Sequence, residues 1–185
     1  MDASWKKPHR RFNPLLGEWI VVSPQRTERP WQGKIEKSPE LSKIQCDADC
    51  YLCPGNGRPG GVRNPKYKSI FSFNNDYPAL VPDSPFRVEG EADSLLVAAP
   101  EAGICRVVCF SPRHDLTLAR MSQEEILPVV NIWTEEMSSL EAFPWVRYVQ
   151  FFENRGALMG ASNPHPHCQI WASGSIPNVP QREFF

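Results

Sequence analysis

Hydrophobic residues between positions 122 and 140 recur at the spacing of one helix face. Ser122 and Glu125 form a capping-box pair, in which each side chain can bond to the backbone N–H of the other residue. Apolar residues then follow at intervals of mostly three or four, namely Ile126, Val129, Val130, Trp133, Met137 and Leu140. The pattern predicts a helix from Ser122 to Leu140, with Pro128 bending its entry.

Shorter apolar or alternating stretches predict strands, at Glu18–Val22, Ile70–Phe73, Leu95–Ala99, Ile104–Phe110 and Trp145–Glu153. A Gly-rich turn over 156–162 then leads into a last strand, from about His165 to Ala172. A helix followed by a strand, a turn and a strand is typical of an antiparallel sheet covered by that helix. The predicted fold class is therefore α+β.

Composition excludes several classes of protein. The 185 residues are 41% hydrophobic and 22% charged, with a formal net charge of −1, as in a globular protein long enough for one domain. Nothing in this charge favours nucleic acid as a partner, and apolar runs such as Leu95–Pro100 are too short to span a membrane. Met1–Arg11 is polar and basic, unlike a secretory signal. We expect a cytoplasmic protein without a membrane partner.

Two of the six cysteines form a C-x-x-C pair in a segment rich in glycine and proline. Cys50 and Cys53 suit half of a zinc site, although a redox pair or a chance spacing gives the same pattern. His114 and His165 are the natural candidates for the other two ligands, and Cys46 ranks below His114. A Cys₂His₂ set would be closed to water, and the zinc would therefore be structural.

Cys105 and Cys109 lie in an apolar stretch, where we expect them to be buried hydrophobic residues. His9 belongs to the basic opening, where we expect a surface residue.

The stretch Asn163–Trp171 carries the most chemical information. Alternate residues of a strand share a face, so His165, His167 and Gln169 would point into one small volume. Two hydrogen-bonded histidines on a polar edge strand would give the same pattern. The preceding residues 156–163 are small, however, and their backbone N–H groups could approach an anion. A histidine at such a place is positioned to attack phosphorus.

A neutral imidazole is nucleophilic near neutral pH and forms a phosphoramidate that can be attacked in turn. The other ring nitrogen must then be held by an acceptor, for which a backbone carbonyl is suitable. Gln169 would donate hydrogen bonds to phosphoryl oxygens. Because an amide has no proton to give up, Gln169 favours an acceptor that brings its own phosphate.

Long motifs of the chain resemble those of the galactose-1-phosphate uridylyltransferases, a branch of the histidine-triad superfamily. The similarity extends over essentially all 185 residues, and Cys168 and Ala161 depart from residues found in some relatives. The matching motifs are His9–Leu15 with Gly17 and Trp19, Val22–Pro24, Arg26, Arg29–Trp31, Phe73–Asp76, Phe152–Gly156 and Ser162–Trp171.

The resemblance implies a double displacement in galactose metabolism, with His167 and Gln169 as catalytic residues. His167 would attack the α-phosphorus of UDP-glucose and release glucose 1-phosphate, and galactose 1-phosphate would then take the uridylyl group. Residues 1–185 would be the amino-terminal, histidine-triad-like half of a two-half transferase, without its carboxy-terminal half. The implied uridine diphosphate pocket consists of Asn75, Asp76, Asn154, Gly160, Ala161, Ser162 and Gln169.

The resemblance also implies partners and metals. Arg26 and Arg29 would reach the site of a neighbouring subunit in a homodimer, as planar guanidinium groups that grip phosphate oxygens; without the family they are two solvated loop residues. The implied zinc ligands are the four named above, Cys50, Cys53, His114 and His165. Glu183 matches an iron ligand whose partner histidines lie in the missing half, so iron would be bound only in a full-length protein.

Two alternatives remain beside the transferase. A relative could use the same histidine to hydrolyse or phosphorolyse a nucleotide sugar. A truncated chain could also be an inactive, zinc-stabilised fragment that binds nucleotide.

Overall fold

The computed structural model describes residues 9–22, 44–83, 101–156, 159, 161 and 163–184. The chain divides into two compact units, residues 1–40 with 176–185 and residues 41–175. The smaller unit contains the antiparallel hairpin of β1 (His9–Asn13) and β2 (Glu18–Val22), and the short helix α2 (Asn178–Glu183). The prediction of β2 is confirmed, whereas β1 was missed because its arginine-rich sequence shows no apolar alternation.

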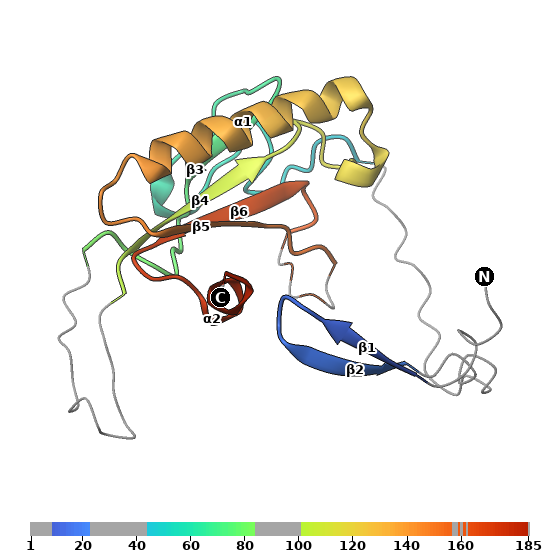
Figure 1. Ribbon diagram of the computed structural model, residues 1–185. Helices are drawn as coiled ribbons and strands as arrows, with labels where there is room; N and C mark the ends of the chain where they lie inside the picture. Colours follow the sequence, from blue (N-terminus) through green and yellow to red (C-terminus); the bar gives the residue numbers. More distant parts are fainter. Residues whose placement is uncertain are drawn as a thin grey trace. The chain divides into compact units, whose positions relative to one another are not determined.

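The larger unit contains a four-stranded antiparallel sheet in the order β3-β4-β6-β5, with α1 lying along one face (Figure 1). This arrangement confirms the predicted α+β class. The elements are β3 (Phe71–Asn74), β4 (Gly103–Cys109), α1 (Gln123–Glu141), β5 (Tyr148–Phe152) and β6 (His167–Ser173), with short 3₁₀ helices at Pro59–Gly61 and Leu118–Arg120. In the described part of the chain, no helix is long and apolar enough to cross a membrane.

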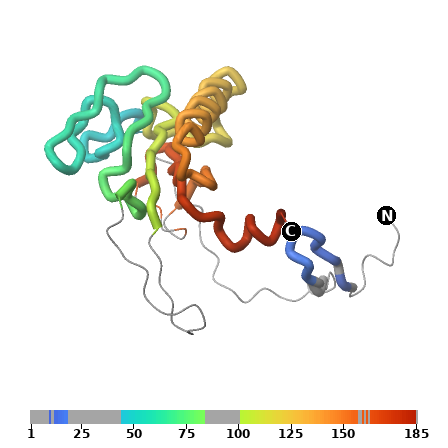
Figure 2. The backbone as a smooth tube through the Cα atoms, turned by 60° about the vertical axis from the view of Figure 1, so that its left-hand side comes forward, coloured from blue at the N-terminus to red at the C-terminus, as the bar shows by residue number. Residues whose placement is uncertain are grey.

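The two faces of strand β6 differ: one packs in the core, and the other carries His167 and Gln169. Cys168, Ile170 and Ala172 are buried in the cluster that also contains Val129 and Leu140 of α1. The alternate residues from His167 to Trp171 are half-buried, and by strand alternation they face away from α1. Residues 44–65, here named the cysteine loop, cover that second face. Figure 2 shows the cysteine loop, in cyan and green, on one side of β4 and α1 on the other.

The helix prediction is confirmed, and Ser122 is the N-cap of α1. The Ser122 hydroxyl accepts from the N–H of Glu125 at 3.3 Å, and the Glu125 carboxylate accepts from the N–H of Ser122 at 2.8 Å. Pro128 is accommodated inside the helix. Val130 is 44% exposed, so it lies off the buried face of the helix. It lies one residue, about 100° of rotation, beyond the buried Val129.

Most predicted strands occur with ends shifted by one to three residues. The shift at the last strand matters most, because pairing begins at His167 rather than near His165. Pro166 has no N–H to donate to a ladder, and His165 therefore lies in the bend before β6. The predicted strand Leu95–Ala99 falls outside the described residues.

A buried ion pair connects α1 to the sheet. Glu136 of α1 is only 7% exposed, and its carboxylate accepts hydrogen bonds from Arg106 of β4 and from the Ser72 hydroxyl of β3. The same Arg106 nitrogen also donates to the hydroxyl of Ser139 at 2.9 Å. This contact could not be predicted from the sequence, because a glutamate in a helix is ordinarily exposed.

Candidate functional site

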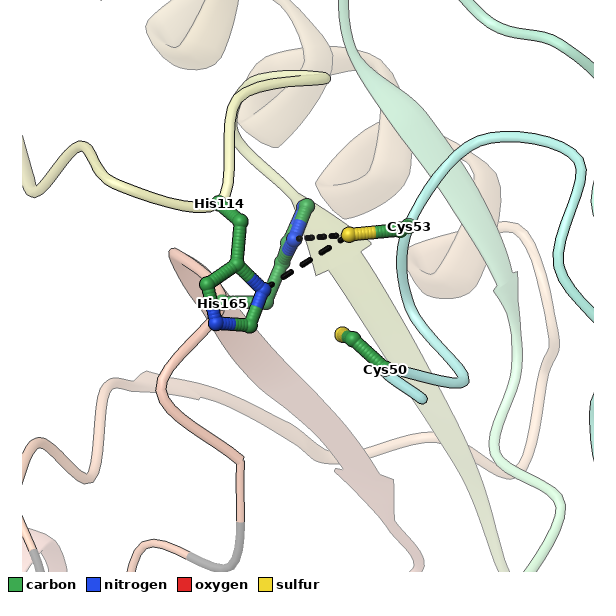
Figure 3. A group of neighbouring side chains, drawn as sticks. All are labelled: Cys50, Cys53, His114 and His165. Atoms are coloured by element: carbon green, nitrogen blue, oxygen red, sulfur yellow. Dashed lines mark hydrogen bonds between the residues drawn. The ribbon is translucent and has the colours of Figure 1, made fainter. Parts of the chain in front are cut away.

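Two cysteines and two histidines meet beneath the cysteine loop. Cys50, Cys53, His114 and His165 are all buried, and one ligand atom from each lies within 4.8 Å of the others (Figure 3). The Sγ atom of Cys53 is 3.6 Å from Nδ1 of His114 and 3.5 Å from Nδ1 of His165. The structure therefore brings together the four residues that the sequence singled out, from three separate segments.

Both imidazoles have an acceptor group near the outer ring nitrogen. Nε2 of His165 lies 2.9 Å from the backbone carbonyl oxygen of Ser111. A carbonyl oxygen can only accept, so the proton sits on Nε2 and the lone pair of Nδ1 points toward the sulfur. Nε2 of His114 lies 4.0 Å from a carboxylate oxygen of Asp47, which is beyond hydrogen-bond distance. Such partners are typical of histidines that bind metal ions.

The cluster is electrostatically unusual without a cation. Burial raises the pKa of the Cys53 thiol to about 12, since a thiolate there would lose its hydration. Burial also lowers the pKa of His165 to about 4. A metal ion stabilises thiolates and neutral imidazoles directly. Two sulfur and two nitrogen donors at this spacing suit a tetrahedral ion, and the cluster can bind a metal ion.

Asparagine side chains hold the cysteine loop in shape, and sequence reasoning missed them. The Asn56 amide donates to the carbonyl oxygens of Asp47 and Cys50, each at 2.8 Å. The buried Asn64 amide donates to the carbonyl oxygens of Tyr51 and Cys53 at 2.8 and 3.0 Å. Asparagine in a Gly/Pro-rich segment is the signal that could have found them.

The remaining cysteines lie outside the cluster. Cys46 is exposed, whereas Cys105, Cys109 and Cys168 are buried. The burial of Cys105 and Cys109 confirms the prediction from their apolar surroundings. All six cysteines fall in the described ranges, and all are free thiols.

The imidazole of His167 is held in one orientation by the backbone. Its Nδ1 lies 2.7 Å from the carbonyl oxygen of His165. Because that oxygen can only accept, Nδ1 carries the proton and Nε2 keeps its lone pair. The sequence predicted a carbonyl partner without naming it, and the structure supplies one from His165, a member of the Cys₂His₂ cluster.

A cavity of about 350 Å³ adjoins His167 on the sheet face opposite α1. Phe73, Val107 and Gln169 form one row across the strands, since Phe73 pairs with Val107 and Val107 with Gln169. The cysteine loop adds an apolar wall. The lining thus combines apolar residues of the loop and the sheet with the polar side chains Asn75, Asp76, His167 and Gln169.

The Gln169 amide has a defined orientation. Its oxygen accepts from the indole N–H of Trp171 at 3.2 Å and from the Asn75 amide at 3.3 Å. Asn75 is oriented in turn, because its oxygen accepts the N–H of Tyr77 at 2.9 Å. Both groups that bond to the Gln169 oxygen are donors, which leaves its NH₂ group to donate to a ligand in the cavity.

The other expected site residues are placed less uniformly. Exposed Glu153 and Asn154 line a smaller cavity of about 30 Å³ that also adjoins His167. Partial desolvation raises the pKa of the Glu153 carboxyl. Ala161 lines neither cavity, and Glu183 is exposed in α2 of the other unit. Outside the described residues are Arg26, Arg29, Gly160 and Ser162.

The chain is similar to known proteins along nearly its whole length. A family model described as galactose-1-phosphate uridyl transferase, N-terminal domain, matches residues 1–177. The chain is 47% identical over 175 residues to a probable galactose-1-phosphate uridylyltransferase of Drosophila melanogaster, covering 94% of this chain and 49% of the relative. It is 48% identical over 177 residues to the galactose-1-phosphate uridylyltransferase of Haemophilus influenzae, covering 95% and 50%. The chain spans about half the length of the curated relatives it matches.

Solved structures agree on the fold. A structure described as uridylyltransferase matches with a TM-score of 0.62 and 26% identity, covering 95% of this chain and 48% of the other. An ADP-glucose phosphorylase from Arabidopsis thaliana, with bound ADP-glucose, gives a TM-score of 0.65 at 20% identity over 96% of this chain and 52% of the other. The second likeness shows the fold alone.

Proposed function

The chain belongs to the galactose-1-phosphate uridyl transferase family through the amino-terminal domain, and on that premise we propose that it carries the nucleotide-transfer site of a UDP-glucose:hexose-1-phosphate uridylyltransferase. Nε2 of His167 attacks the α-phosphorus of UDP-glucose, and the bond from that phosphorus to glucose 1-phosphate breaks. A phosphate oxygen of galactose 1-phosphate then attacks the same phosphorus. The P–N bond breaks, UDP-galactose leaves, and the lone pair returns to Nε2.

The observation that carries this proposal is the 2.7 Å contact between Nδ1 of His167 and the carbonyl oxygen of His165. It keeps the proton on Nδ1 and leaves Nε2 able to attack without first losing a proton. It also stabilises the positive charge that the ring acquires when the P–N bond forms. The leaving group is a phosphate, which departs as an anion and needs no proton.

The cavity accounts for the rest of the substrate by chemical type. The apolar end, with Phe73 and Val107, suits a nucleobase, and the Asp76 carboxylate repels phosphate but accepts from ribose hydroxyls. The NH₂ group of Gln169 then donates to the phosphoryl oxygens as their charge shifts. We assign Asn75 to the same pocket. On the strength of the family motif alone, we also assign Asn154, Gly160, Ala161 and Ser162 to substrate binding.

Further partners follow from family membership. Arg26 and Arg29 of one subunit would contact phosphate at a neighbouring subunit's site, and the working protein would be a homodimer. Galactose metabolism is the corresponding role. The free thiols of all six cysteines suit a reducing compartment, and we therefore place the protein in the cytoplasm.

We assign zinc to the cluster of Cys50, Cys53, His114 and His165. Four protein donors leave no open position, so the zinc would hold the cysteine loop and His165 in place. Glu183 would contribute to an iron site whose other ligands come from sequence outside this chain.

The test is the product formed from UDP-glucose and galactose 1-phosphate. The proposal predicts UDP-galactose and glucose 1-phosphate. UMP without galactose 1-phosphate would indicate a hydrolase, and UDP formed only with inorganic phosphate would indicate a phosphorylase. Nucleotide binding without any product would identify an inactive nucleotide-binding fragment.

A further inference from the structure

Arg58 lies in the cysteine loop beside the cavity, and the proposed reaction steps do not involve its side chain. The side chain is only 10% exposed. Its guanidinium carbon lies 3.8 Å from the centroid of the Phe73 ring, and its Nε lies 3.7 Å from a carboxylate oxygen of Asp76. Both of these residues line the cavity. Arg58 therefore contacts the aromatic and the acidic parts of the cavity wall at once.

The hydrogen bonding of Arg58 is incomplete. Its Nε and Nη1 atoms are buried and have no hydrogen-bond partner among the residues that the structure describes. Buried donors without acceptors are rare, because each loses its water without a replacement. At 3.7 Å the Asp76 carboxylate is near enough for attraction but beyond hydrogen-bond distance. Contacts within the described part of the chain therefore do not account for the burial of the Arg58 guanidinium.

The hydrogen bonds that hold the backbone of the cysteine loop do not involve the Arg58 side chain. The N–H of Arg58 donates to the carbonyl oxygen of Val62 at 2.7 Å, and Gly57 pairs with Arg63 in a β-bridge. Arg63 provides a contrast, since it is exposed and its guanidinium donates to the carbonyl oxygen of Gly55 at 2.7 Å. One arginine of the loop thus bonds to the loop itself, whereas the other points its charge at the cavity wall.

We propose that Arg58 is a positioning residue for the nucleoside end of the cavity. Its guanidinium group holds the Phe73 ring and the Asp76 carboxylate in a fixed relation to each other. A planar guanidinium can stack on an aromatic ring and attract a carboxylate at its edge at the same time. The ring then faces the base, and the carboxylate accepts from the ribose hydroxyls. This inference rests on the proposed function for the orientation of the nucleotide.

Two consequences distinguish this role from others. Because Arg58 acts on the nucleoside end, its loss weakens binding of uridine and UMP by the same factor. Because it aims Asp76, its loss also reduces the preference for UMP over 2′-deoxyuridine 5′-monophosphate (dUMP). An arginine that gripped phosphate would instead affect UMP and leave uridine unchanged.

The experiment measures dissociation constants of uridine, UMP and dUMP by calorimetry on the full chain. Arg58→Met keeps the length and apolar contact of the side chain but removes its charge, and Arg58→Lys keeps the charge without the planar group. Lys66→Met, which removes an exposed cation near the same loop, is the matched control. Thermal unfolding of each variant establishes that it is folded.

We expect Arg58→Met to weaken uridine and UMP binding about tenfold each, the scale of one charge-assisted contact. The UMP-to-dUMP preference falls toward one, Arg58→Lys is intermediate, and Lys66→Met matches the wild type. Unchanged affinities in Arg58→Met, or a loss for UMP alone, would overturn the positioning role. If Arg58→Met does not fold, an Arg58→Lys variant with wild-type affinities and preference overturns it. Wild-type protein that binds neither uridine nor UMP would overturn the proposed function itself.

Discussion

Nδ1 of His167 and the backbone carbonyl oxygen of His165 lie 2.7 Å apart. The same His165 turns its ring into the Cys₂His₂ cluster, where its Nδ1 is 3.5 Å from Cys53. One residue therefore joins the metal cluster through its side chain and orients the proposed nucleophile through its backbone. A metal ion at the cluster would fix the aim of His167 without taking part in the chemistry.

Loss of a cluster cysteine should destabilise the protein in a way that chelators reproduce. Cys50→Ala removes one of four donors, and the remaining ligands hold zinc less tightly. A loss of about 3 kcal/mol would lower Tm by about 6–12 °C in a domain of this size. Thermal unfolding with and without a chelator, together with zinc content by mass spectrometry, checks this.

The control for that prediction is Cys46→Ala, because Cys46 is exposed and lies outside the cluster. It should keep the zinc content and the Tm of the wild type. The zinc assignment would be refuted if chelators left the Tm of the wild-type protein unchanged and Cys50→Ala had the same Tm as the wild type.

Gln169→Ala should slow transfer to His167 by about 10²–10³, the usual cost of losing one donor to a developing oxyanion. Trp171→Phe should cause a smaller loss, because it removes one of two donors that orient the Gln169 amide. Gln150→Ala, an exposed change on the neighbouring strand β5, should have no effect. Single-turnover rates with UDP-glucose measure all three, and equal rates for Gln169→Ala and wild type would exclude a role for the amide.

Glu136→Ala should destabilise the larger unit by about 2 kcal/mol, since it leaves Arg106 of β4 without its partner. The figure is below that of a fully buried pair because the Arg106 side chain is 22% exposed. Glu135→Ala changes the exposed neighbour and should alter stability by less than about 0.5 kcal/mol. Urea unfolding of both variants gives the comparison, and similar midpoints would contradict it.

Alkylation of the native protein with iodoacetamide at pH 8 should label Cys46 alone. The thiolate is the reactive form, and burial raises the pKa of Cys109 and Cys168 to about 12. About one thiol in 10,000 of these two is then ionised at pH 8. Mass spectrometry of peptides should find one modified cysteine in the native state and six after denaturation. Early labelling of Cys168 would show that the core of the larger unit is open.

The sequence could predict what depends on local pattern. The capping box at Ser122 and the apolar spacing after it defined α1, and the rarity of histidine and of C-x-x-C pairs singled out the cluster ligands. His165 was predicted to lie in the last strand, because residues before proline prefer extended geometry. The strand in fact begins at His167, because Pro166 has no N–H to donate to the ladder.

What the sequence could not predict are contacts between distant segments. Arg58 and Asp76 are separated by β3, and nothing near either residue indicates that they approach each other. The pairing of Glu136 with Arg106 requires the packing of α1 on the sheet. The carbonyl partner of His167 depends on the backbone bend at His165 and Pro166.

The most direct test of the account is an intact-mass spectrum of the purified chain after incubation with UDP-glucose, beside a His167→Ala control. The account predicts one added uridylyl group on the wild type, none on His167→Ala, and loss of the group when galactose 1-phosphate is added. An adduct that persists in His167→Ala, or a wild-type chain that binds UDP-glucose and never gains the group, would contradict the claim that His167 of this chain is the nucleophile.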